Sequence, residues 1–420
     1  MRLLLISQLL LALAAVAVPG RCAADVDPQM AGDVSAIDIG DGPDSIAMVD
    51  LNRDHRPDLV VIDRYINSVS VLLNKGDGSF ALRSKHTTGL RPSALAAADF
   101  NRDGNADIVV ANAGSDSVSI LFGKNNGTLD KRTDYQAGRV PCAVIVGDLN
   151  RDNNGDLVIL NRYGNSVSVL LGNGDGSFRA KTDYEAGRLP YSVAIADANG
   201  DGKLDLLLTS CFDQAVSLLP GNGDGTFGPK IRYAKAEQCC GFVIGDLDGN
   251  GRFGLVEVHR YGYLIAIQFG TDGGRPGARS DYLAGKGPRC TLKADFNGDG
   301  IPDLAVASAG HYAGDSGSIL ILLGNRIGGF EPKNSYVTGS GSHSLAVGDV
   351  NGDGKLDLAI ANGSYDYGGS VSVLLGNGDG TFGRRTDYPT GGYVVWVTFK
   401  EDSISGSQGS AVWNERPPDN

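Results

Sequence analysis

The chain has 420 residues, with 37 lysines and arginines against 49 aspartates and glutamates, and its formal net charge is −12. A surface with this charge disfavours nucleic acids and anionic membranes, because proteins that bind those partners present basic patches. Glycine is abundant, at 61 residues, but it recurs in register with apolar runs, so the composition does not indicate disorder.

The first 24 residues have the pattern of an export signal. Met1 and Arg2 form a short basic start, residues 3–18 are mostly apolar, and Cys22 is followed by two alanines at a small-residue cleavage site. The apolar stretch is short for a membrane span, so we expect cleavage and no membrane insertion, with an uncleaved anchor as the alternative. The sequence therefore predicts a secreted protein, extracellular or periplasmic, with residues 25–34 as a linker.

One unit then repeats through residues 35–399. Seven acidic motifs begin with an aspartate, at Asp50, Asp99, Asp148, Asp197, Asp246, Asp295 and Asp349. These aspartates lie 49 residues apart five times in succession, and the last step is 54 residues. A fixed period of this length indicates stacked supersecondary units that cannot bury their apolar faces alone.

The third copy shows what one unit contains. Residues 143–147, 157–160 and 166–171 read as three short strands, and residues 178–184 read as a fourth. The Gly-Asn-Gly-Asp-Gly stretches at 172–176, 221–225 and 376–380 read as hairpin turns rather than as metal sites. The expected fold is all-β, a seven-bladed β-propeller of four-stranded antiparallel blades whose first strands line the channel, with a β-solenoid as the alternative.

The two ends of the repeat region resemble each other. Residues 35–49 and 386–399 both read as the end of one copy followed by the first strand of the next. We therefore expect one end to complete the blade at the other, which would remove exposed sheet edges. Residues 400–420 read as a polar tail.

The acidic motifs have the residue spacing of calcium loops between strands one and two. Carboxylates at positions 1, 5 and 9, Asn or Asp at position 3 and a carbonyl at position 7 supply the hard oxygens that calcium prefers. Glycine at position 6 permits the sharp turn. The predicted side-chain ligands are Asp50, Asn52, Asp54 and Asp58; Asp99, Asn101, Asp103 and Asp107; Asp148, Asn150, Asp152 and Asp156; Asp197, Asn199, Asp201 and Asp205; Asp295, Asn297, Asp299 and Asp303; and Asp349, Asn351, Asp353 and Asp357.

The copies differ in how well they fit this pattern. His55 replaces the turn glycine in copy one, so we expect weaker binding there, whereas Asn153 in copy three tolerates the turn. In copy five, residues 246–254, positions 5 and 9 are Asn250 and Gly254, so this loop is expected to be empty or weak. The sequence thus predicts about five or six calcium ions. The alternative is that the motifs are Asx-rich turns that bind no ion.

These motifs resemble a known family. The pattern Asp-x-Asn-x-Asp-Gly-x-x-Asp-Leu, followed by Ser-Val-Ser-Val-Leu-Leu-Gly-Asn-Gly-Asp-Gly-Thr-Phe, is similar to the FG-GAP or VCBS repeat, which includes the integrin α-subunit propeller and a seven-bladed fungal lectin. The resemblance implies structural calcium on one face and recognition on the other. The family spans adhesion proteins and lectins, so it implies no particular ligand.

The turns between strands two and three lie on the face opposite the acidic loops, and they are rich in rings. The candidate ligand-binding residues there are Arg64, Tyr65, Arg162, Tyr163, Arg260, Tyr261, His311, Tyr312, Tyr365 and Tyr367. Tyrosine beside arginine can stack on a sugar or anchor a protein. We expect a carbohydrate or an extracellular protein as partner. The alternative is that the tyrosines fill the rim and the arginines pair with nearby aspartates.

The sequence contains no recognised catalytic motif. Its five histidines are scattered, so we expect a binding protein, with a propeller hydrolase or lyase as a less favoured alternative. Five cysteines remain after cleavage, and their pairing stays open: Cys142, Cys211, Cys239, Cys240 and Cys290. Lys293 stands where the other copies have an apolar residue, which the sequence does not explain.

Overall fold

The computed structural model describes residues 43–399, apart from residues 65, 76–79, 211, 214, 236–238, 249, 251, 260–262, 272–275, 311–315, 326–328, 365–367 and 390–397. For some further strand residues it describes only the backbone. The expected export signal, the linker at 25–34 and the tail at 400–420 lie outside the described residues. No helix in the described part of the chain is long and apolar enough to cross a membrane.

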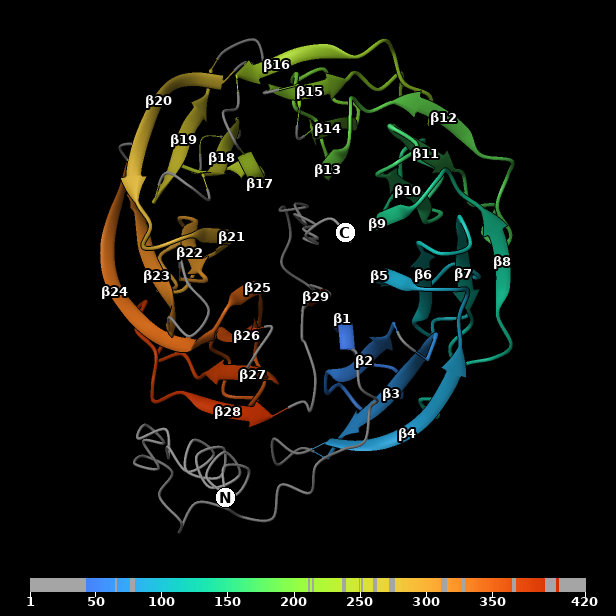
Figure 1. The fold of residues 1–420 in the computed structure, drawn as a ribbon, viewed down its shortest axis with the longest axis horizontal. Coiled ribbons are helices and arrows are strands. Elements are labelled where there is room, and N and C mark those ends of the chain that lie inside the picture. Colours follow the sequence, from blue (N-terminus) through green and yellow to red (C-terminus); the bar gives the residue numbers. More distant parts are fainter. Residues whose placement is uncertain are drawn as a thin grey trace, which may run out of the picture. The chain divides into compact units, whose positions relative to one another are not determined.

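Seven antiparallel sheets follow one another around a ring, each with four consecutive strands (Figure 1). Blade 1 contains β1 (Pro43–Val49), β2 (Asp58–Asp63), β3 (Ser68–Asn74) and β4 (Phe80–Thr87). Blade 2 contains β5 (Pro92–Ala98), β6 (Asp107–Asn112), β7 (Ser117–Leu121) and β8 (Thr133–Gln136). Blade 3 contains β9 (Pro141–Gly147), β10 (Asp156–Asn161), β11 (Ser166–Leu170) and β12 (Thr182–Glu185). Blade 4 contains β13 (Pro190–Ala196), β14 (Asp205–Ser210), β15 (Ala215–Leu219) and β16 (Ile231–Lys235).

The remaining three blades repeat this order. Blade 5 contains β17 (Cys239–Asp246), β18 (Phe253–His259), β19 (Leu264–Gly270) and β20 (Pro276–Leu283). Blade 6 contains β21 (Pro288–Ala294), β22 (Asp303–Ser308), β23 (Ser316–Asn325) and β24 (Gly329–Ser340). Blade 7 contains β25 (Ser342–Gly348), β26 (Asp357–Ser364), β27 (Gly368–Leu374) and β28 (Thr386–Pro389). The predicted seven-bladed, all-β propeller is confirmed, with the first strand of each blade innermost (Figure 1).

One strand of the template copy was predicted wrongly. The fourth strand of blade 3 is β12, which begins at Thr182 rather than at Phe178. Phe178 instead closes the hairpin through an isolated bridge to Gly172, and its side chain is buried. Residues 172–176 form the predicted turn, with Gly174 and Gly176 at positive φ.

The chain ends meet at the first blade. A short strand near the C-terminal end, β29 (Thr398–Phe399), pairs in parallel with β1 and also contacts β25 of blade 7. Each four-stranded blade is complete in itself, so neither end supplies a missing strand as we expected. The ring is instead closed by an added strand between the innermost strands of blades 7 and 1.

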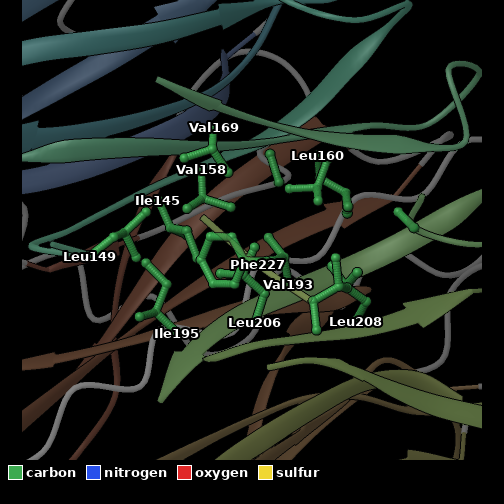
Figure 2. Close-up of a cluster of buried hydrophobic side chains, with 14 of the residues drawn as sticks. Ile145, Leu149, Val158, Leu160, Val169, Val193, Ile195, Leu206, Leu208 and Phe227 are labelled. Atoms are coloured by element: carbon green, nitrogen blue, oxygen red, sulfur yellow. The ribbon is translucent and has the colours of Figure 1, made fainter. Parts of the chain in front are cut away.

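The core consists of apolar clusters between successive blades. Figure 2 shows the cluster between blades 3 and 4, where Phe227 lies among aliphatic side chains that include Val158 and Leu206. Phe227 follows a hairpin turn of blade 4 and meets Tyr184 of blade 3 edge to face, with ring centroids 5.4 Å apart. The backbone N–H of Phe227 also donates to the Tyr184 hydroxyl at 3.3 Å. The Phe of the repeated hairpin therefore reaches into the preceding blade.

Candidate functional site

The acidic loops join the first and second strands of their blades, and the six loops whose positions 4 and 6 are described curl through two left-handed residues. Position 6 has positive φ wherever it is described, whether it is glycine or one of the two residues that replace it, His55 at 62° and Asn153 at 60°. Position 4 is also left-handed, with φ of 59° at Arg102 and 76° at Gly200. The sequence identified the turn at position 6 but not the one at position 4, because arginine occupies position 4 in the first three copies.

Within each loop, the side-chain oxygens accept hydrogen bonds from the loop's own backbone. In copy two, the carboxylate of Asp99 accepts from the N–H groups of Asp103 at 3.2 Å and Gly104 at 2.8 Å. The Asn101 side-chain oxygen accepts from the Asp103 N–H at 3.0 Å, and Asp103 accepts from the Asn105 N–H at 2.7 Å. The same pattern holds Asp50, Asp148, Asp197, Asp295 and Asp349 in their loops.

The aspartate at position 9 fastens the loop to the blade. Asp156 is fully buried, and its carboxylate accepts from the N–H of Leu149 at 2.9 Å and that of Gly172 at 2.8 Å. It thus joins the start of the loop to the end of the third strand. The equivalent residues Asp58, Asp107, Asp205, Asp303 and Asp357 are buried in the same way.

Burial raises the pKa of these position 9 carboxyls. The pKa of Asp156 rises from 3.8 to about 6, chiefly through desolvation, with a smaller contribution from the negative charges of Asp152 and Asp148. The carboxyls of Asp58, Asp107 and Asp303 also have pKa values of about 6 for the same main reason. Positions 1, 5 and 9 are therefore close enough to repel one another electrostatically, which a bound cation would relieve.

The donor set of six loops fits calcium in its chemistry. Each offers carboxylate and amide oxygens with a backbone carbonyl at position 7, and calcium takes six to eight oxygen ligands. Among the described residues, no group of three or more His, Cys, Asp or Glu side chains is arranged to hold a metal ion. The loop oxygens face backbone N–H groups, so binding requires some of them to turn toward a shared ion.

The loop of copy five is different in structure as well as in sequence. A side chain at Gly254 would meet the backbone carbonyl of Gln268 at 2.9 Å, so position 9 has no room for aspartate. The structure shows a role for Lys293, which stands where the other copies have an apolar residue. Its ammonium donates to the backbone carbonyl of Asp246 at 3.3 Å. A fixed positive charge from blade 6 therefore lies at the base of this loop.

Arginines at position 4 link neighbouring loops. Arg53 of blade 1 donates to the carbonyl of Asp103 at 2.7 Å and to that of Gly104 at 3.2 Å. Arg102 of blade 2 donates to the carbonyl of Asp152 at 2.9 Å. These contacts, which the sequence did not reveal, cross from one blade to the next on the loop face.

On the opposite face, the structure describes three of the ten candidate ligand residues. Tyr163 is 55% exposed in the turn between β10 and β11, beside half-buried Arg162. The guanidinium carbon of Arg162 lies 5.6 Å from the ring centroid of Tyr191. Arg64 is half-buried in the equivalent turn of blade 1. Tyr65, Arg260, Tyr261, His311, Tyr312, Tyr365 and Tyr367 lie outside the described residues, so their placement stays a prediction, and Arg64, Arg162 and Tyr163 are not brought to one point.

The same face exposes further large side chains beyond the ten candidate residues. Phe212 is 56% exposed in the turn of blade 4, and Tyr263 is 43% exposed in that of blade 5. Ile66 in blade 1 is 53% exposed, and Leu90, in the connection between blades 1 and 2, is 56% exposed. The turns and connections of five blades therefore present rings or aliphatic groups to solvent.

Two cysteines are described with their side chains. The Cys142 thiol donates to the carbonyl of Leu160 at 3.4 Å. Cys290 has a free thiol, and burial raises its pKa to about 11, so it is not a reactive thiolate at neutral pH. The side chains of Cys211, Cys239 and Cys240 lie outside the described residues.

The family of the chain follows from its repeats. The FG-GAP-like repeat model matches residues 50–110, 99–159, 148–208, 199–256, 295–360 and 349–400. The chain belongs to the FG-GAP repeat family. None of the matches to this FG-GAP protein begins at the fifth loop, which is the copy that has no carboxylate at positions 5 and 9. No match to a curated protein was found for the sequence.

Solved propellers share the fold at low sequence identity. A functionally unknown protein from Desulfotomaculum acetoxidans is 11% identical with a TM-score of 0.55, covering 80% of this chain and 96% of its own. A putative 6-phosphogluconolactonase from Bacteroides uniformis is 14% identical with a TM-score of 0.54, covering 82% and 95%. A protein from Lactobacillus plantarum is 10% identical with a TM-score of 0.55, covering 84% and 97%. At these identities the likeness concerns the fold alone.

Proposed function

We propose that this FG-GAP propeller is a secreted recognition module that binds a carbohydrate on the face opposite its acidic loops. The observation that carries the proposal is the exposure of large side chains there, with Tyr163 and Phe212 each more than half exposed. An exposed ring at the end of a rigid turn can stack on the apolar face of a sugar. Shallow sites repeated from blade to blade would add their affinities through multivalency.

Calcium has a structural role in this proposal. Six loops would each hold one ion, with side chains from positions 1, 3, 5 and 9 and the carbonyl of position 7 as ligands. Support comes from the all-oxygen donor set and from the position 9 carboxyls, whose pKa values are raised chiefly by burial and to a smaller extent by the charges of the other loop aspartates. The ions would lie on the loop face and leave the other face available for a partner.

The testing experiment is glycan-array binding by the protein purified after export, first in calcium and then in EDTA. We expect binding to a coherent set of sugars in calcium, and weaker binding in EDTA because the blades loosen. A folded, calcium-loaded sample that binds no glycan would overturn the carbohydrate proposal and favour an extracellular protein partner or a scaffold role.

Catalysis is the second candidate function. One solved propeller with this fold carries the name of a putative 6-phosphogluconolactonase, which motivates an assay for lactone hydrolysis. Recognition is favoured because the exposed rings described above lie on separate blades at the rim, whereas catalysis needs groups that converge on one substrate. Lactone turnover abolished by a substitution in this chain would move the assignment to an enzyme.

A further inference from the structure

The connections that lead from each blade into the innermost strand of the next carry exposed cations. Arg139 and Arg188 each lie two residues before the proline that begins the innermost strand, in blades 3 and 4, and both are exposed. Lys286 has the same place before blade 6, and Arg91 lies one residue before β5 of blade 2. Because these strands are innermost, the four cations lie at the inner ends of their connections, before blades 2, 3, 4 and 6, on the face opposite the acidic loops.

The backbone holds these connections rigidly. Val140, beside Arg139, has φ of 54°, and its N–H donates to Asp116 of the preceding blade at 2.7 Å. Its carbonyl accepts from the N–H of Arg162 in its own blade at 3.0 Å. Leu189, with φ of 49°, donates to Asn165 of the preceding blade at 2.8 Å. Arg139 thus stands on a connection tied to two blades, and Arg188 on one tied to the preceding blade, so little backbone ordering is needed there on binding.

At least one of the cations is paired with an exposed ring. The guanidinium carbon of Arg188 lies 4.5 Å from the ring centroid of Phe212, and both side chains are exposed. Stacking on a ring occupies one face of the planar guanidinium and leaves its N–H edge available for a carboxylate. A ring and an anion-binding edge therefore lie side by side, as recognition of an acidic sugar requires.

The acidic side chains on this face are mostly engaged within the protein. In its described turns and connections they are Asp63, Asp116, Glu185 and Asp213. Asp63 is buried, and Asp116 accepts the Val140 N–H. Lys230 pairs with both Glu185 and Asp213, at 2.8 and 3.4 Å. A chain with net charge −12 therefore keeps a cation cluster on one face, made of Arg91, Arg139, Arg188 and Lys286.

We infer that this cation cluster binds an anionic polysaccharide. The carboxylate or sulfate groups of successive sugars would pair with the cations of successive connections. The inference rests on the proposed carbohydrate binding and specifies its ligand class. Equivalent cations precede the innermost strands of blades 2, 3, 4 and 6, three of them in succession, which suits a polymer with repeated charges. An isolated charge would need only one of them.

The test compares three fluorescent polymers: alginate as a polyuronate, dextran as a neutral glucan and single-stranded oligothymidylate as a non-sugar polyanion. We expect the protein to bind alginate with an affinity that falls as salt rises, and to bind the other two much more weakly. In the double variant Arg139→Gln, Arg188→Gln, the Kd for alginate should rise at least about tenfold, since hydrogen bonds to charged groups are among the stronger ones. Arg384→Gln is the matched control. It removes an exposed charge just before β28, away from the cation cluster, and should leave the Kd for alginate unchanged.

Each of the other possible results of this test would overturn a different part of the inference. Binding of dextran but not of alginate would leave the proposed function intact and overturn the anionic ligand. Equal binding of oligothymidylate would show a general polyanion surface instead of a glycan site. An equal loss of affinity in the double variant and in Arg384→Gln would place the site elsewhere. If no glycan binds at all, the proposed function fails together with the inference.

Discussion

The ninth residue of each intact acidic loop is a buried carboxylate that serves two purposes. Asp156 accepts hydrogen bonds from the N–H groups of Leu149 and Gly172, so it fastens the loop to the blade. Its burial raises its pKa to about 6. The same desolvation that makes the charged form costly in the ion-free loop makes a bound cation more favourable.

This pKa shift predicts an unusual pH dependence in the absence of calcium. Asp58, Asp107, Asp156 and Asp303 have folded-state pKa values of about 6 against 3.8 for the exposed group. Between these values the folded state binds more protons than the unfolded state, so its stability falls as pH rises through the window. In EDTA, we expect a higher melting temperature near about pH 5 than near about pH 7. A melting temperature in EDTA that rises steadily from about pH 5 toward about pH 7 would contradict this prediction.

Strain at the rim offers a second residue-level prediction. Val140 is β-branched and yet has φ of 54°, a conformation that costs an L-residue about 1–2 kcal/mol. Asparagine tolerates this conformation, so Val140→Asn should raise the free energy of unfolding by about 1 kcal/mol in urea titrations. Val337→Asn is the control, because Val337 is exposed in an ordinary strand and should show no gain. An equal change in both variants would show that backbone strain is not the cause.

At the scale of the structural element, six loops keep the full set of proposed calcium ligands and the fifth does not. Gly254 has no room for a side chain, and Lys293 already places a positive charge at the base of that loop. The fifth loop can therefore hold its shape without an ion, whereas the others carry carboxylates that repel one another.

Ion stoichiometry tests this difference directly. Asp197→Ala should lower the number of bound calcium ions by one, because Asp197 is the first proposed ligand of an intact loop. Asp246→Ala, the same change in the fifth loop, should leave the number unchanged. Atomic absorption on the dialysed proteins measures both, and the loss of one ion in each variant would show that the fifth loop binds as well.

At the scale of the whole molecule, seven blades are held together by contacts that cross from each blade to the next. Phe227 and its counterparts insert into the preceding blade, Arg53 and Arg102 link neighbouring loops, and β29 closes the ring at β1. Loops that stiffen on binding calcium would act on all these contacts together, so stability and calcium should be strongly coupled.

Removing calcium should therefore lower the melting temperature sharply. A ligand at a hundred times its Kd stabilises a protein by about 2.7 kcal/mol per site. With several such sites, EDTA should lower the melting temperature by more than about 5 °C. Restoring calcium should recover the original melt, whereas magnesium, with its stricter octahedral geometry, should not. A melt unchanged by EDTA would refute the structural role of calcium.

The sequence predicted the periodic features well and the non-periodic ones poorly. The 49-residue spacing of the aspartates and the hairpin at 172–176 were enough for the blade count and the strand order. Arg102 in a left-handed turn was missed because arginine carries no such signal, and the buried position of Asp156 was missed because ligands and hydrogen-bond acceptors use the same residues. The link from Lys293 to Asp246 joins positions 47 residues apart, which only the closed ring brings together. The cations before the innermost strands could have been found from the repeated Gly-Arg-Val-Pro and Gly-Arg-Leu-Pro segments.

The most direct test is to separate stability from recognition by substituting one face at a time. In saturating calcium and well below the melting temperature, glycan affinity and melting temperature are measured for Tyr163→Ala, Phe212→Ala on one face and for Asp197→Ala on the other. We expect the variant that lacks the two aromatic rings to lose glycan binding with little change in its melting temperature. The Asp197→Ala variant should have a lower melting temperature and still bind the glycan. If the loop variant loses binding and the ring variant keeps it, the ligand lies on the acidic face and the division of roles between the two faces is wrong.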